Sequence, residues 1–128
     1  MTEAIQAICK AIGANGCCFL SSLKVFGRER DFYALWNECQ ESGILRADGF
    51  LAKPEELAFK LTGKRWKYTH VAADYHPNPG EKILNFYKFG ALEHFTAVDD
   101  SGEWDPLGNS NTRLKGKLTA RRLYKEVS

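Results

Sequence analysis

The spacing of apolar residues changes at Gly63, and this change constrains the fold more than any other feature of the chain. Before Gly63, apolar residues recur at helical intervals, as in Phe32, Leu35, Trp36 and Cys39. After it, residues 66–71 and 83–89 alternate between apolar and polar, which is typical of strands. Helices followed by antiparallel strands predict an α+β fold, here a single domain over residues 1–128.

The expected elements follow from these patterns and from the capping residues. Helices are predicted over residues 2–12, 17–26 and 31–42, the third capped by Asp31, and a fourth begins at Pro54 and is ended by Gly63. The helix over 17–26 is nearly all apolar in its first turn, so we expect it to be central and buried. Further strands are predicted over 94–98 and 121–127, with a turn at residues 99–102.

Composition excludes several classes of function. The 128 residues carry a net charge of +2, are 44% apolar, and contain no apolar run long enough to span a bilayer. The N-terminal residues include Glu3 and no basic region, unlike a secretory signal. We therefore expect a cytoplasmic protein that binds neither membrane nor nucleic acid. A nucleic-acid site would require the basic segments 64–67 and 113–125 to converge on one face.

The four cysteines are expected to be free thiols. They are Cys9, Cys17, Cys18 and Cys39, with no Cys-x-x-Cys pair among them, and adjacent cysteines are poorly placed to share one tetrahedral ion. We therefore expect no structural zinc, no other metal and no cofactor. Cys9 and Cys39 lie on apolar helical stripes and are predicted to be core residues.

Cys17 follows Gly16 at the start of the predicted buried helix. A thiolate at a helix N-terminus has a lowered pKa, and the free amides there can donate to an oxyanion. The alternative is that Cys17 simply fills core space as a small apolar residue. Periodicity does not choose between Cys17 and Cys18 as the reactive thiol.

A histidine and a carboxylate are predicted to meet on the strands further along. If residues 99–102 form a four-residue hairpin turn, Val98 pairs with Glu103, and Ala97 with Trp104. His94 and Asp105 then become diagonal neighbours on one face, together with Thr96 and Glu103. We expect Asp105 to be a rim carboxylate that contributes little to stability. His70, on another strand, is an alternative base without such an acid, and His76 lies in a Pro/Gly loop.

These segments resemble the papain-like cysteine peptidase superfamily. The resemblance is carried by Asn15-Gly16-Cys17-Cys18-Phe19, Glu93-His94-Phe95 and Trp104-Asp105-Pro106, and it is closest to the branch that processes bacteriocin leaders and to small bacterial and phage-associated proteins of that fold. It implies a papain-like fold, with N-terminal helices packed on a C-terminal antiparallel sheet. It also implies thiol-dependent cleavage of a peptide or amide bond in a peptide or protein substrate.

Carried over residue by residue, the resemblance makes Cys17 the nucleophile, His94 the general base and acid, and Asp105 the residue that orients His94. The Cys17 sulfur and the His94 ring should then lie about 3 to 4.5 Å apart. One position departs from the superfamily, because Ala11 stands where a glutamine usually supplies an oxyanion donor. The oxyanion would then be bound by backbone amides or by Asn15, or the protein is a catalytically silent, peptide-binding relative.

Overall fold

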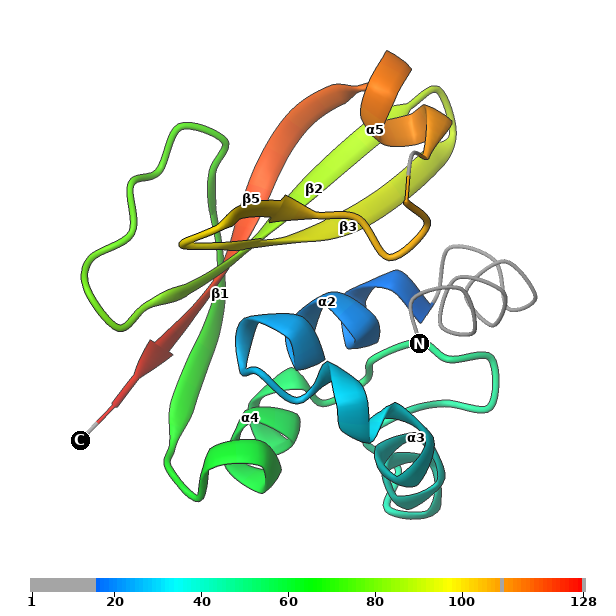
Figure 1. Cartoon of the computed structure of the whole chain (residues 1–128), viewed down its shortest axis with the longest axis vertical. Coiled ribbons are helices and arrows are strands. Elements are labelled where there is room, and N and C mark those ends of the chain that lie inside the picture. The colour runs from blue at the N-terminus through cyan, green and yellow to red at the C-terminus, as the bar shows by residue number, and fades with distance from the viewer. Residues whose placement is uncertain (1–15, 109, 128) are drawn as a thin grey trace.

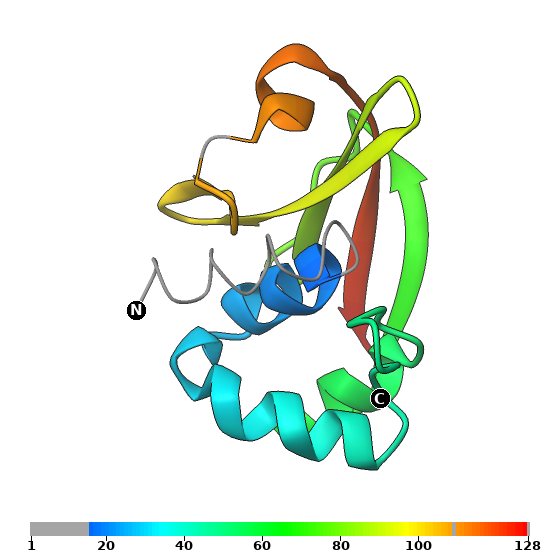
Figure 2. The ribbon, with the colours of Figure 1, turned by 90° about the vertical axis from the view of Figure 1, so that its right-hand side faces the viewer.

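The architecture is α+β, with the helices preceding the sheet along the chain, as the change of periodicity predicts. The computed structural model describes residues 16–108 and 110–127, so the helix expected over residues 2–12 lies outside the described part. The main helices are α2 (Cys17–Val25), α3 (Phe32–Glu41) and α4 (Pro54–Thr62). In Figures 1 and 2, α2 lies between the sheet and the other two helices.

The central position of α2 follows from its composition. Seven of its residues are buried, among them Phe19, Leu20 and Leu23. One side of α2 packs against Phe32 and Leu57 from α3 and α4, in the larger of two apolar clusters. Because the first turn presents apolar atoms in every direction, the helix is covered from both layers.

The helix ends agree in part with the expected caps. Gly63 ends α4 in the left-handed conformation, with φ 73°, which a glycine adopts without steric cost. Asp31 stands at the N-cap position of α3, as expected, but its side chain makes no capping hydrogen bond. A short 3-10 turn, Glu29–Asp31, leads into the helix, and the Asp31 carboxylate instead accepts a hydrogen bond of 2.6 Å from Arg28.

The five strands form one antiparallel sheet in the order β1-β5-β2-β3-β4. The strands are β1 (Trp66–Ala72), β2 (Lys82–Phe89), β3 (Leu92–Asp99), β4 (Gly102–Trp104) and β5 (Lys117–Glu126). Strand β5 begins four residues before the expected position 121, because residues 117–120 continue its pairing with β2. The face that carries Leu84, Ala97 and Tyr124 packs against Val25 of α2.

The hairpin between β3 and β4 has the predicted register. Val98 pairs with Glu103, and Ala97 with Trp104. The Asp99 carboxylate accepts hydrogen bonds from the backbone and hydroxyl of Ser101, which closes the turn. Strand β4 ends at Trp104, so Asp105 stands just beyond the ladder.

A short helix, α5 (Asn111–Lys115), was not expected from the sequence. It lies above the end of the sheet near β2 and β3 (Figure 1). Gly116 ends it at a close backbone approach, because a Cβ at this position would meet the carbonyl oxygens of Thr112 and Lys88. Within the described part of the chain, no helix is both long enough and apolar enough to cross a membrane.

Candidate active site

The thiol of Cys17 lies against the imidazole of His94. Cys17 is the first residue of α2, directly after Gly16, and His94 is on β3. Its Sγ atom is 3.1 Å from His94 Nδ1, within the expected range, although the two residues are 77 positions apart. The start of the buried helix and the third strand therefore meet as the sequence predicts.

Two buried serines fix α2 on the sheet and so fix the position of Cys17. The Ser22 and Tyr124 hydroxyls lie 2.9 Å apart, which joins the helix to β5. The Ser21 hydroxyl donates to the Phe95 carbonyl at 3.3 Å, which joins it to β3 beside His94. Polar groups buried in an apolar helix need such partners, and here the partners set the register between helix and sheet.

The other nitrogen of His94 is bound by Asp105. Its Nε2 lies 2.7 Å from Asp105 Oδ1. Asp105 is only 7% exposed, so the expectation of a rim carboxylate is wrong. Its Oδ1 also accepts from the Leu107 backbone at 2.8 Å, and its Oδ2 accepts from the Ser110 backbone at 3.1 Å.

The surroundings of Asp105 keep it ionised. Burial alone would raise the pKa of this carboxyl, but the hydrogen bond and charge of His94, with the bonds from Arg113 and Ser110, hold the pKa well below its usual range. An ionised Asp105 only accepts hydrogen bonds, so Nε2 of His94 carries a proton. In the neutral imidazole, Nδ1 is then free to accept the proton of the Cys17 thiol.

Arg113 is a site residue that no sequence pattern indicates. Its Nε donates to Asp105 Oδ2 at 2.9 Å, and its Nη1 lies 3.8 Å from Glu103. Glu103, whose place on the His94 face was predicted, accepts hydrogen bonds from the side chains of Asn85, Tyr87 and Thr96. Arg113 therefore links Asp105 to a polar network around Glu103.

Cys18, the other candidate nucleophile, points elsewhere. Its sulfur lies 3.6 Å from the Tyr68 hydroxyl. Burial raises the pKa of Cys18 to about 11, although the Tyr68 hydrogen bond and the charge of Arg122 act in the opposite direction. Of the two adjacent thiols, only Cys17 has the imidazole contact.

The remaining cysteines and histidines are placed apart from this site or are not described. Cys39 is buried in the core between the helices, as expected. Cys9, Ala11 and Asn15 lie outside the described residues. His70 is exposed on β1 with its ring 6.4 Å from that of Tyr68, and His76 is exposed in the loop before β2.

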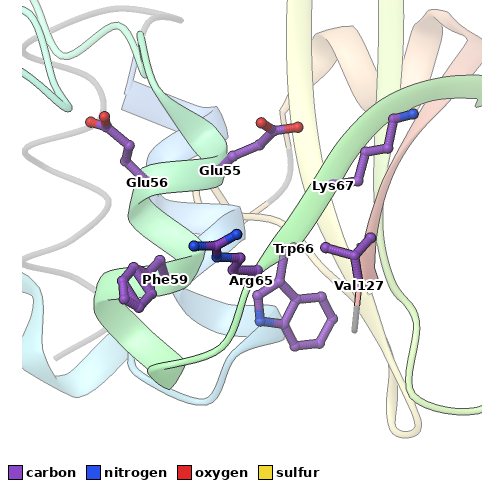
Figure 3. Close-up of a pocket in the computed structure, with 7 residues that line it drawn as sticks. All are labelled: Glu55, Glu56, Phe59, Arg65, Trp66, Lys67 and Val127. Atoms are coloured by element: carbon purple, nitrogen blue, oxygen red, sulfur yellow. The ribbon is translucent and has the colours of Figure 1, made fainter.

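The site is closed in this structure. Cys17 is 0% exposed and His94 is 2% exposed. A separate pocket of about 650 Å³ lies between α4 and the start of β1, and Figure 3 shows its lining side chains, Phe59 and Trp66 among them. None of the three site residues lines it.

Across residues 16–108 and 110–127, no three His, Cys, Asp or Glu side chains are grouped as a metal ion would require. Comparison of the chain with protein-family models, with curated proteins and with solved structures found no match.

Proposed function

We propose that the protein is a thiol-dependent hydrolase of papain-like fold that cleaves a peptide or amide bond. The observation that carries the proposal is the continuous set of contacts from the Cys17 sulfur through both nitrogens of His94 to Asp105, at 3.1 and 2.7 Å. Thiol, imidazole and carboxylate in this order are the parts of a cysteine-nucleophile site.

In the proposed mechanism, Cys17 Sγ attacks the substrate carbonyl while His94 Nδ1 takes the thiol proton. The α2 amides at this end, which have no partner within the helix, donate to the oxyanion. The imidazolium then gives its proton to the leaving amine, and a thioester with Cys17 forms. Water, deprotonated by His94, hydrolyses the thioester, while Asp105 holds the ring and balances its charge.

Turnover requires the site to open, because the sulfur has no exposed surface. This burial is also the one observation that favours a second candidate, a catalytically silent relative that binds a peptide. In that protein Cys17 is a core residue and the imidazole contact is structural. The two candidates differ in whether an electrophile of substrate-like size reaches the sulfur.

The test is site-resolved labelling by a peptide chloromethyl ketone, read by mass spectrometry between pH 5 and 9. We expect Cys17 to react at least tenfold faster than Cys18 and Cys39 near pH 6, because its partner imidazole can take the thiol proton. His94→Ala should remove the advantage, and His76→Ala, a loop histidine, should retain it. If Cys17 is labelled no faster than the core thiol Cys39 in the folded protein, the second candidate, a catalytically silent relative, is correct.

Several cations of the two basic segments are engaged within the protein. Lys64 pairs with Glu126 at 3.6 Å, and Arg113 is turned inward to Asp105. Arg121 donates to Asn85 and to the Tyr75 carbonyl. Lys67 and Lys125 of the same segments are exposed and lie opposite one another in the ladder of β1 and β5.

A further inference from the structure

A pocket of about 290 Å³ is lined by the chain neighbours of the proposed nucleophile and base. Cys18, the residue after Cys17, lines it from the start of α2. Glu93 and Phe95, the two neighbours of His94, line it from β3. Neither Cys17 nor His94 itself lines the pocket, which lies one residue away from the reacting side chains along both elements.

The pocket is mainly apolar, with one cation. Phe50, Leu51 and Phe95 form its apolar walls. Tyr68 lines it from β1, and Arg122 lines it from β5. The Arg122 guanidinium is held over two rings, with its central carbon 4.7 Å from the Phe86 centroid and 5.5 Å from that of Phe95. Stacking of this kind fixes the plane of the guanidinium and leaves its edge for hydrogen bonding.

Within the described part of the chain, Arg122 forms no ion pair with a carboxylate. Among the described residues, each lysine or arginine in an ion pair has its acid within 4.0 Å. Arg122 is in none of these pairs. Its guanidinium donates a hydrogen bond of 3.4 Å to the Arg121 carbonyl. Glu93 lines the same pocket but is exposed and makes no ion pair with it. Burial and the charge of Arg122 lower the pKa of His70, which disfavours its charged form.

We propose that this pocket binds a carboxylate of the substrate, with Arg122 as the recognising residue, within two residues of the scissile bond. The inference rests on the proposed function for the position of that bond. A half-buried guanidinium among apolar walls interacts more strongly with a carboxylate than an exposed one does, because water screens the pair less. The preferred substrate is therefore acidic next to the cleavage site.

The first arm of the test measures labelling rates of Cys17 by acetyl-Glu-Gly and acetyl-Gly-Glu chloromethyl ketones and by their glutamine counterparts. For at least one position, the glutamate probe should react about tenfold or more faster than the glutamine probe. Arg122→Gln should abolish this preference, Arg122→Lys should retain part of it, and Arg122→Glu should favour a lysine probe. Arg65→Gln, the same charge change at a distant surface position, should leave the preference intact.

The second arm measures binding and does not depend on catalysis. Acetyl-Glu-Gly amide, acetyl-Gln-Gly free acid and acetyl-Gln-Gly amide are titrated into Cys17→Ala protein, and Arg122 side-chain resonances are followed by NMR. A carboxylate-bearing peptide should bind at least fivefold more tightly than the uncharged one, and the first two peptides show whether the side chain or the chain terminus supplies the carboxylate.

The two proposals fail in different ways. Absence of Cys17 labelling with carboxylate-dependent binding would overturn the hydrolase and keep the pocket assignment. Fast Cys17 labelling without any preference for glutamate, and equal binding of all three peptides, would overturn the pocket assignment alone. A glutamate preference that survives Arg122→Gln would also overturn it, because another group would then bind the carboxylate.

Discussion

At the scale of single residues, Asp105 combines two roles that are usually separate. Its Oδ1 accepts from His94 and from the Leu107 backbone, and its Oδ2 accepts from Ser110 and Arg113. The carboxylate therefore orients the imidazole and also closes the loop between β4 and α5. A substitution here should affect reactivity and stability together, and the two effects need separate measurement.

Asp105→Asn and Asp105→Ala should form a graded series. Cys17 labelling should be fastest in the wild type, slower in Asn, whose amide oxygen still accepts from His94, and slowest in Ala. The alanine variant should also lose about 1–3 kcal/mol of unfolding free energy, because buried donors are left without an acceptor. Labelling is compared at equal concentrations of folded protein, and unfolding is followed in urea.

Asp100→Asn is the matched control, since Asp100 is an exposed carboxylate in the adjacent turn. It should change neither quantity. Equal labelling rates for all three residues at position 105 would mean that His94 is oriented by another group.

The sequence predicts some of these contacts and not others for a clear physical reason. His94 and Asp105 are separated by a tight turn between alternating strands, where the side-chain period fixes which residues share a face. Arg113 reaches the same carboxylate through an irregular loop and a five-residue helix. No periodicity governs such a path, so its contact with Asp105 could not be predicted. The burial of Asp105 depends on that same loop.

At the scale of elements, α2 determines which thiol meets which environment. Successive residues of a helix are turned by about 100°. Cys17 therefore contacts His94, while Cys18 contacts Tyr68 on the other side. The apolar composition of α2 predicts that it is buried, but the direction of each thiol depends on how Ser21 and Ser22 bond to the sheet.

The junction of α5 and β5 offers a test of how elements support the site. Gly116→Ala should destabilise the protein by about 1–3 kcal/mol, because the added Cβ meets backbone oxygens that cannot move independently. The displaced α5 should weaken the Arg113–Asp105 contact and slow Cys17 labelling. Urea unfolding and mass spectrometry measure the two effects.

Lys115→Ala, at the exposed neighbouring position, is the control and should change stability by less than about 0.5 kcal/mol. If Gly116→Ala matches it in stability, the backbone at this junction is not closely packed.

Among the described elements, the sequence predicts those in which apolar residues recur at a regular period. It does not predict segments whose conformation depends on contacts with distant parts of the chain. The helices α2, α3 and α4 and the strands β1, β2 and β3 lie where periodicity places them, within a few residues. The start of β5 was missed because residues 117–120 owe their extended form to pairing with β2. The helix α5 is too short to show a helical period.

At the scale of the whole molecule, the stability should depend on pH through Asp105. The pKa of its carboxyl is lowered in the folded state, so the unfolded chain takes up the proton first as the pH falls. The stability that ionised Asp105 supplies is full above about pH 4, the usual range for an aspartate, and is lost progressively below it. The unfolding free energy of the wild type should therefore exceed that of Asp105→Asn by an amount that shrinks as the pH falls from 5 to 2.

The difference in unfolding free energy between the two proteins reports the contribution of Asp105 alone, because both proteins contain all the other carboxyl groups. Urea unfolding at pH 7, 5, 3 and 2 measures it. A difference that does not change with pH would show that Asp105 titrates alike in the folded and unfolded states.

The strand order has a consequence for how the molecule folds. Strand β5 lies between β1 and β2, and Trp66 pairs with Glu126, far along the chain, whereas β2, β3 and β4 are joined by short turns. The local three-strand meander can form early, whereas β1 joins the sheet only through its pairing with β5. Pairings between distant segments slow folding, because the closure of a long loop must precede the contacts that reward it. We therefore expect the thiol and the imidazole to meet late, once the sheet that carries β3 has received the helix that carries Cys17.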